Sequence, residues 1–86
     1  MNFQDFIKEF KALNNKRGNV QIKHKLYGNQ KLNKCVLRPF WDGERIGLTM
    51  DDGEEKFITI EETREFSINE NEYCIKSDVM EFNIVS

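Results

Sequence analysis

The sequence contains three side chains of types that can act as nucleophile, general base and metal ligand: His24, Cys35 and Cys74. Nucleophilic catalysis needs a base within hydrogen-bond reach of a serine or cysteine, and no spacing along the chain places His24 beside one. A structural zinc site usually takes four ligands, which one histidine and two scattered cysteines do not supply. We therefore interpret His24 as a satisfied, partly buried histidine and the cysteines as reduced thiols that require no disulfide.

The other polar residues do not form a catalytic pattern either. Carboxylates are plentiful, but they are adjacent acids in expected turns, where such groups are normally solvated rather than held for acid–base work. Gly43, Gly47 and Gly53 fit two turns and a strand, not a glycine-rich phosphate loop. We therefore expect no enzyme, no cofactor and no metal site.

The charge distribution is the most informative feature of the sequence. Residues 1–50 hold ten Lys or Arg against four Asp or Glu, whereas residues 51–86 hold three against eleven, and the net charge is −2. Such an asymmetry between halves can point to a charged partner. Alternatively, the two halves neutralise each other across neighbouring strands. The sequence leaves both alternatives open.

The first functional hypothesis is a small, non-catalytic protein-binding module that docks an acidic surface on a basic partner surface. Acids expected in turns and strand ends, with two aromatic anchors, would form it: Asp51, Asp52, Glu54, Glu55, Glu61, Glu62, Glu65, Phe40 and Trp41. In size and acidity the chain resembles, at the level of class, inhibitors from phages and mobile elements. These include anti-CRISPR proteins that mimic nucleic acid and occupy nucleic-acid-binding surfaces.

The alternative hypothesis is an oligomeric nucleic-acid-binding barrel that uses the basic first hairpin. The cations of that hairpin would contact phosphates: Lys23, Lys25, Lys31, Lys34 and Arg38. Tyr27, Phe40 and Trp41 would stack on bases. The net charge of −2 and the isoelectric point near 5.4 count against this hypothesis.

Length and composition predict one small domain, residues 1–86, with 38% hydrophobic and 33% charged residues. No window approaches the roughly 20 apolar residues of a membrane span. The first residues lack the basic start and apolar run of a signal peptide. We therefore expect a cytoplasmic monomer or homodimer without membrane association.

An amphipathic helix is predicted over residues 2–14. Asn2 can cap the first turn of this helix, and Gly18 can end the helix. We expect its apolar stripe to pack on the domain's own sheet. The residues of that stripe are three and four apart: Phe3, Phe6, Ile7, Phe10 and Leu13.

Runs with the two-residue period of β-strands follow the helix. The predicted fold class is therefore α+β, a helix followed by an antiparallel meander of about six short strands. Because open sheet edges are a liability, we expect the sheet to curl. The order resembles in outline the small SH3-like and Sm-like barrels, without an Sm signature sequence. The strands are expected at about residues 20–27, 34–41, 44–50, 55–60, 64–68 and 72–85, the last broken near 77–78.

Two hairpin turns set the expected register. A two-residue turn at Asp42-Gly43 pairs Leu37 with Leu48. A three-residue turn over residues 51–53, with Gly53 in the left-handed conformation, pairs Ile46 with Ile58. Both registers gather one apolar face: Cys35, Leu37, Pro39, Ile46, Leu48, Met50, Ile58 and Ile60. In the first strand the apolar face is expected to hold Val20, Ile22, His24 and Leu26.

Overall fold

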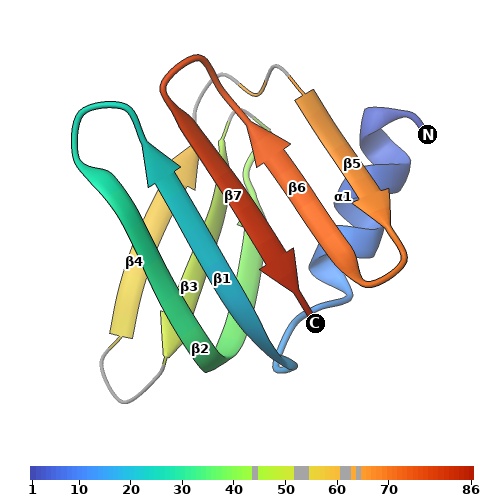
Figure 1. The fold of residues 1–86 in the computed structure, drawn as a ribbon. Helices are drawn as coiled ribbons and strands as arrows, with labels where there is room; N and C mark the ends of the chain where they lie inside the picture. Colours follow the sequence, from blue (N-terminus) through green and yellow to red (C-terminus); the bar gives the residue numbers. More distant parts are fainter. Residues whose placement is uncertain (44, 52–54, 61–62, 64) are drawn as a thin grey trace.

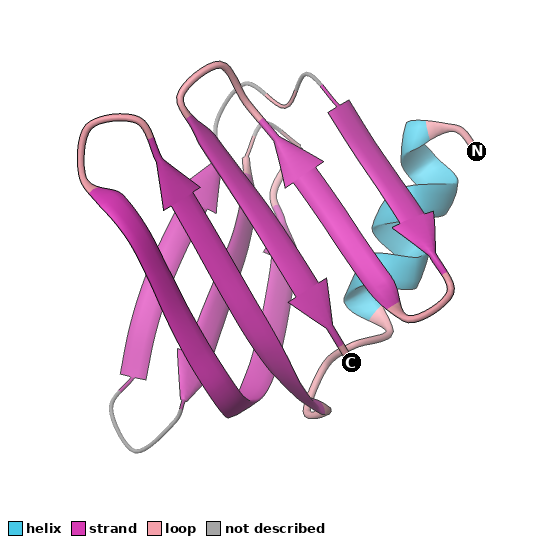
Figure 2. Cartoon of the chain, viewed as in Figure 1, coloured by secondary structure: helices cyan, strands magenta, loops and turns pink. Residues whose placement is uncertain are grey.

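The computed structural model describes residues 1–43, 45–51, 55–60, 63 and 65–86, with the backbone alone for residues 55–58 and 60. The described residues form one helix, α1 (Phe3–Lys11), and seven strands of one antiparallel sheet (Figures 1 and 2). The predicted α+β class is therefore confirmed. The strands are β1 (Arg17–His24), β2 (Gly28–Trp41), β3 (Ile46–Asp51), β4 (Glu55–Ile60), β5 (Glu65–Asn69), β6 (Glu72–Lys76) and β7 (Met80–Val85).

The strand order in the sheet is β4-β3-β2-β1-β7-β6-β5. The chain thus forms two meanders, β1–β4 and β5–β7, which join because β7 returns to pair with β1 from Asn19↔Val85 to His24↔Met80. The prediction of one continuous meander is therefore wrong, because β4 and β5 are consecutive in the chain but lie at the two ends of the strand order. The sheet bends so that β3 and β4 lie behind β1 and β7 (Figure 1). No described residue of β4 pairs with β5, so the sheet is open and the expected barrel is not shown.

Helix α1 lies beside β5 (Figure 1) and packs its phenylalanines against the sheet. The ring of Phe3 contacts Trp41 of β2 at 5.1 Å and Phe66 of β5 at 5.2 Å, between ring centroids. The helix therefore bridges two strands that do not pair with each other. The buried core consists of Phe6, Ile7, Phe10, Leu13, Val20, Ile22, Leu32, Cys35, Leu37, Ile46, Leu48, Met50, Ile75, Phe82 and Ile84.

The start of the helix agrees with the sequence, whereas its end differs. The Asn2 side chain accepts a hydrogen bond from the backbone N–H of Asp5 at 2.8 Å, which confirms the predicted cap. The chain turns at Asn15, whose φ of 67° is left-handed, so Gly18 is not the stop signal. Gly18 lies in β1, where an added Cβ would come within 2.9 Å of the Val85 carbonyl oxygen.

The first hairpin turns earlier than predicted. β1 ends at His24, which pairs with Gly28, and the turn consists of residues 25–27. Gly28 takes a φ of 83°, a conformation that glycine adopts without strain, and β2 begins there. Gln30 and Lys31 lie between the strands predicted at 20–27 and 34–41, where a turn was expected. They instead pair with β1, because tertiary pairing overrides weak strand propensity. Leu26 is 79% exposed, so its predicted place on the buried face is wrong.

A β-bulge lies between β1 and β2. Asn19 faces two residues of β2, Asn33 and Lys34, between the pairs Gly18↔Cys35 and Val20↔Leu32. Lys34 has a φ of 53°, and its N–H donates to Asn19 Oδ1 at 2.9 Å. The extra residue shifts the alternation, so that Leu32 and Cys35 both face the core. Strict alternation along β2 would put residues 32 and 35 on opposite faces of the sheet, so it could not predict that both are buried.

The next two hairpins shift in register by two residues. Leu37, Ile46, Leu48 and Met50 are buried on one face as predicted, whereas the side chains of Ile58 and Ile60 lie outside the described residues. Leu37 pairs with Met50 rather than Leu48, and Ile46 pairs with Ile60 rather than Ile58. A shift of two leaves every side chain on its own face, because the strand period is two. The Asp42 carboxylate accepts a hydrogen bond from the Arg45 N–H at 2.7 Å, which favours a longer turn than Asp42-Gly43. The predicted conformation of Gly53 lies outside the described residues.

Candidate protein-binding surface

Two hairpin turns lie side by side at one end of the molecule (Figure 1). The first, residues 25–27, joins β1 to β2, and the second, residues 77–79, joins β6 to β7. The backbone N–H of Lys25 donates to the carbonyl oxygen of Val79 at 2.9 Å, which extends the β1–β7 pairing into the turns. We call residues 25–27 together with 77–79 the hairpin-tip surface.

The hairpin-tip surface carries exposed apolar side chains. Tyr27 is 85% exposed, Leu26 79% and Val79 48%. Among the described residues only Met1 and Val85 are other large apolar side chains with comparable exposure. Single exposed apolar residues are ordinary, but several on one patch mark an interaction site.

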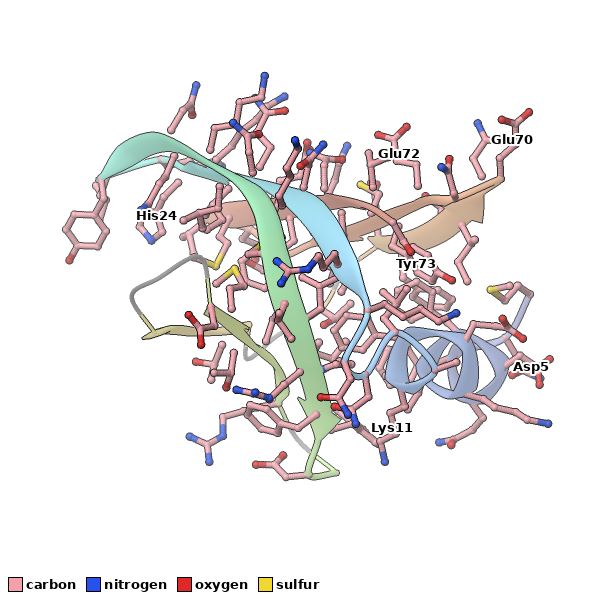
Figure 3. The ribbon with its side chains drawn as sticks, turned by 90° about the horizontal axis from the view of Figure 1, so that it is seen from below. Asp5, Lys11, His24, Glu70, Glu72 and Tyr73 are labelled. Atoms are coloured by element: carbon pink, nitrogen blue, oxygen red, sulfur yellow. The ribbon has the colours of Figure 1, made fainter. Side chains whose placement is uncertain are left out.

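His24 fixes the conformation of the first turn. Its Nδ1 accepts hydrogen bonds from the backbone N–H groups of Leu26 at 3.0 Å and Tyr27 at 3.2 Å. Its ring also lies against the Tyr27 ring, with 4.5 Å between centroids. Figure 3 shows His24 where the β1–β2 hairpin ends. The interpretation of His24 as a satisfied, partly buried histidine is confirmed, and its role is to position the turn.

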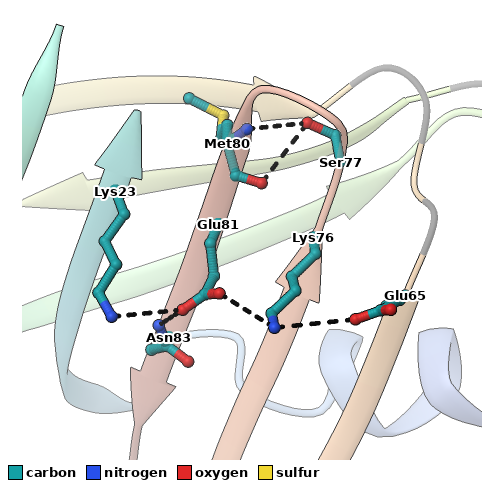
Figure 4. A network of polar contacts seen from close by, with 7 residues as sticks. All are labelled: Lys23, Glu65, Lys76, Ser77, Met80, Glu81 and Asn83. Carbon is teal, nitrogen blue, oxygen red and sulfur yellow. Dashed lines mark hydrogen bonds and ion pairs between the residues drawn. The ribbon is translucent and has the colours of Figure 1, made fainter. Parts of the chain in front are cut away.

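Ser77 fixes the second turn in a similar way. Its hydroxyl oxygen accepts hydrogen bonds from the backbone N–H groups of Val79 at 3.3 Å and Met80 at 3.2 Å (Figure 4 shows the latter). The backbone N–H of Ser77 donates to the Met80 carbonyl at 2.8 Å. Both turns are thus held by side-chain acceptors, which lowers the conformational entropy that binding would cost.

Two hollows adjoin the hairpin-tip surface. One, of about 340 Å³, opens beneath Tyr27 and is lined in part by Ile22, Met80 and Thr59. The other, of about 320 Å³, runs between the two hairpins and is lined in part by Lys23, Lys25 and Lys76. We call the second hollow the lysine groove.

A row of alternating charges crosses the outer face of the sheet below the turns (Figure 4). Glu81 of β7 contacts Lys23 of β1 at 3.7 Å and Lys76 of β6 at 3.3 Å, between charged atoms. Lys76 also contacts Glu65 of β5 at 3.7 Å. On this face Lys23 of the basic half meets Glu81 of the acidic half, which is the cross-strand contact that one alternative from the sequence proposed. Lys76 and its two carboxylate partners all belong to the acidic half.

The same contacts shift two pKa values. The hydrogen bond from the Asn83 amide, 2.6 Å long, and the contact with Lys76 hold the pKa of the Glu81 carboxyl below its ordinary value, although partial burial opposes this. The hydrogen bond to Glu81 raises the pKa of the Lys76 ammonium. Both groups are therefore charged at neutral pH.

The structure does not assemble the predicted acidic surface within its described part. Asp52, Glu54, Glu61 and Glu62 lie outside the described residues, as does the side chain of Glu55. Asp51 ends β3 and Glu65 begins β5, and these two strand ends lie at opposite ends of the molecule (Figure 1). Glu65 is engaged with Lys76.

The two predicted aromatic anchors contact their own chain. Trp41 packs edge-on against Phe3 of the helix. The Phe40 ring covers Gly47, where an added Cβ would lie only 1.7 Å from Phe40 Cε1. Their role in binding stays a prediction, although neither is as exposed as Tyr27.

The predicted basic residues separate into two groups. Lys23 and Lys25 line the lysine groove, where they meet Lys76, a residue that the sequence did not connect with them. The others follow β2 away from the tip: Lys31 opposite Gln21, Lys34 in the bulge and Arg38 opposite Thr49. All five are exposed.

The cysteines face opposite sides of the sheet and are free thiols, as expected. Cys35 is buried, and its Sγ donates to the Gly18 carbonyl oxygen at 3.3 Å. Cys74 lies on the outer face opposite Asn83 and Ser67. Partial burial and the nearby Glu81 raise the pKa of the Cys74 thiol, which disfavours the reactive thiolate.

No protein-family model, curated protein or solved structure matches this chain. Within the part of the chain that the structure describes, no helix combines the length and apolarity that a membrane crossing requires. Val79 was not predicted from the sequence, and Leu26 was predicted on the apolar face of the first strand. The signal for a turn at this position was the run of Lys25, Tyr27 and Gly28 around Leu26, but the turn was expected between the strands predicted at 20–27 and 34–41.

Proposed function

We propose that this chain is a small, non-catalytic protein-binding module and that the hairpin-tip surface is its binding surface. The observation that supports this is the exposure of Leu26, Tyr27 and Val79 on two turns that hydrogen-bond to each other. Exposed apolar residues gathered on one patch are typical of protein interaction sites. Tyrosine is also enriched among the residues that dominate binding energy.

The rigidity of the turns supports the same proposal. His24 and Ser77 accept two backbone hydrogen bonds each, so both turns are held in place without a partner. A surface that is ordered before binding loses less conformational entropy on association.

The acidic-surface version, which includes a phage or anti-CRISPR-like inhibitor, stays a hypothesis, because five of its seven acidic side chains lie outside the described residues. One observation favours nucleic acid as a second candidate. Tyr27 is exposed next to Lys25, as a base-stacking residue beside a phosphate contact would be. The net charge of −2 still opposes it.

A photo-crosslinking experiment tests the proposal. Benzoylphenylalanine replaces Tyr27 in one variant and Lys11 in a control, an exposed position that lies far from His24 in Figure 3. After irradiation in cells of the native host, we expect a protein adduct from position 27 and none from position 11. Adding Leu26→Ser and Val79→Ser to the first variant should abolish the adduct.

Three results would contradict the proposal: no adduct at position 27, the same adducts at both positions, or nucleic acid as the crosslinked species. Circular dichroism and thermal unfolding show whether the serine variants remain folded. Substitutions at exposed turn residues usually change stability by less than about 0.5 kcal/mol, so lost crosslinking in a folded variant reports on the surface itself.

A further inference from the structure

The lysine groove lies between the two hairpins, beside the exposed apolar side chains of the hairpin-tip surface. Its volume is about 320 Å³, and it runs along Val79, one of the exposed apolar residues. Three ammonium groups line it, from Lys23 of β1, Lys25 of the first turn and Lys76 of β6. Charged and apolar features thus adjoin each other on one surface.

Lysines outnumber carboxylates in the lysine groove. Glu81 is the one carboxylate among its described lining residues, and it is shared between Lys23 and Lys76 while also accepting from Asn83. No ion pair joins Lys25 to another described residue. Two acids lie nearby: Glu65 contacts Lys76 from the side of β5, and exposed Asp78 lies in the second turn.

We propose that the lysine groove binds an acidic side chain of the partner protein, next to apolar partner residues that cover Leu26, Tyr27 and Val79. Lys25 would be its main contact, because Lys23 and Lys76 already share Glu81. This inference rests on the proposed function and specifies the partner's docking segment as acidic and apolar. The sequence suggested an acidic surface that meets a basic partner, whereas here a basic groove meets an acidic segment of the partner.

The surroundings favour a peptide segment over a nucleic-acid strand. A strand needs a run of cations that follows successive phosphates. Glu81, Glu65 and Asp78 interrupt the cations around the groove, and they would repel those phosphates. The exposed side chains of Leu26 and Val79 are aliphatic, so they can pack against apolar side chains of a peptide but cannot stack on bases as aromatic rings do.

The test uses two tetrapeptide probes with the same apolar end, acetyl-Glu-Glu-Leu-Phe-amide and acetyl-Lys-Lys-Leu-Phe-amide. Titrations of the full chain are followed by amide chemical shifts in NMR spectra. We expect the acidic peptide to bind at least about fivefold tighter than the basic one, with shifts concentrated at residues 23–29 and 76–81. Raising the salt concentration should reduce this preference.

Matched charge reversals locate the contact. Lys25→Glu should weaken acidic-peptide binding by about fivefold or more, whereas Lys31→Glu, the same change on the same hairpin outside the groove, should alter it by less than about twofold. Equal binding of the two peptides, no binding of the acidic one, or equal effects of the two reversals would each overturn the inference. Tighter binding of a single-stranded octanucleotide than of the acidic peptide would replace it with the nucleic-acid candidate.

The inference and the proposed function can fail separately. If position 27 still crosslinks a protein but the charge reversals have no effect, the hairpin-tip surface stands and the acidic partner segment is wrong. If no protein crosslinks at position 27 while the acidic peptide still binds, the groove binds anions but the proposed function is wrong.

Discussion

Single side chains decide whether the exposed turns are ordered. An imidazole with an unprotonated Nδ1 can accept hydrogen bonds, and in His24 this nitrogen receives two of them from the turn that carries Leu26 and Tyr27. From the sequence, His24 was predicted to be a satisfied histidine rather than a catalytic or metal-binding one. In the structure its Nδ1 accepts backbone hydrogen bonds, so under the proposed function it would act by ordering the turn rather than by contacting the partner.

Replacing His24 with Phe removes this acceptor and keeps an aromatic ring beside Tyr27. We expect global stability to fall by no more than about 1 kcal/mol, because water can solvate the released N–H groups in an exposed turn. The amides of Leu26 and Tyr27 should exchange with deuterium clearly faster, and crosslinking from position 27 should weaken. Unchanged exchange at both amides would show that His24 does not hold the turn.

Strand pairing brings together charges that are distant in the chain. Lys23 meets Glu81 because β7 pairs with β1, and Lys76 meets Glu65 because β5 pairs with β6. An isolated exposed ion pair contributes little to the stability of a fold. Ion pairs that share a residue, as these do, form a network and can contribute more. This element-scale arrangement gives stability a predictable pH dependence.

The Glu81→Gln variant tests that dependence. The pKa of Glu81 is lowered from its ordinary 4.5, so its carboxylate adds stability above that pH, and this stability is lost as the pH falls through the folded pKa. We expect the variant to be less stable than the wild type by up to about 1 kcal/mol at neutral pH. Urea unfolding should show the difference shrinking as the pH falls below 4.5 and vanishing once the carboxyl group of the folded protein is protonated.

Glu72→Gln is the matched control for this experiment. It removes a carboxylate from neighbouring β6 that forms no ion pair with another described residue. We expect it to change stability by less than about 0.5 kcal/mol at neutral pH. A constant difference between wild type and Glu81→Gln across the whole pH range would mean that the lowered pKa does not stabilise the fold.

At the scale of the whole molecule, two charged surfaces compete as the working surface. The acidic-surface hypothesis requires a basic partner, whereas the lysine groove requires an acidic partner segment. The two hypotheses predict opposite effects on association when the net charge of the molecule is made positive by substitutions outside the hairpin-tip surface. Electrostatic steering depends on the field of the whole molecule, so association rates report which sign the partner carries.

Changing Asp51, Asp52, Glu54 and Glu55 together to Lys makes the protein strongly basic, and we expect it to associate faster with the crosslinked partner. The groove reversals Lys23→Glu and Lys25→Glu should slow association. Stopped-flow measurements at two salt concentrations, on variants shown to be folded by circular dichroism, provide the rates. Slower association of the quadruple variant would instead support the acidic-surface hypothesis.

The sequence by itself determined the features that depend on local periodicity. The stripe of Phe6, Ile7 and Phe10 places one face of a helix in the core whatever it packs against. The alternation around Leu37 and Leu48 assigned their faces correctly even though both hairpin registers were two residues off. A period of two is unchanged by a shift of two, so faces are predictable where exact pairs are not.

Only the tertiary structure decided which segments meet. The bulge at Asn19 sets the alternation of β2, and it forms through a hydrogen bond to Lys34, fifteen residues away. The turns that carry Tyr27 and Val79 come together because β7 pairs with β1, and no local pattern encodes that pairing. Such contacts form between strands that are far apart in the chain. Which strands pair depends on a competition among several possible long-range pairings, each of which must offset the entropy lost when the intervening loop closes. The hairpin-tip surface and the lysine groove are products of that competition.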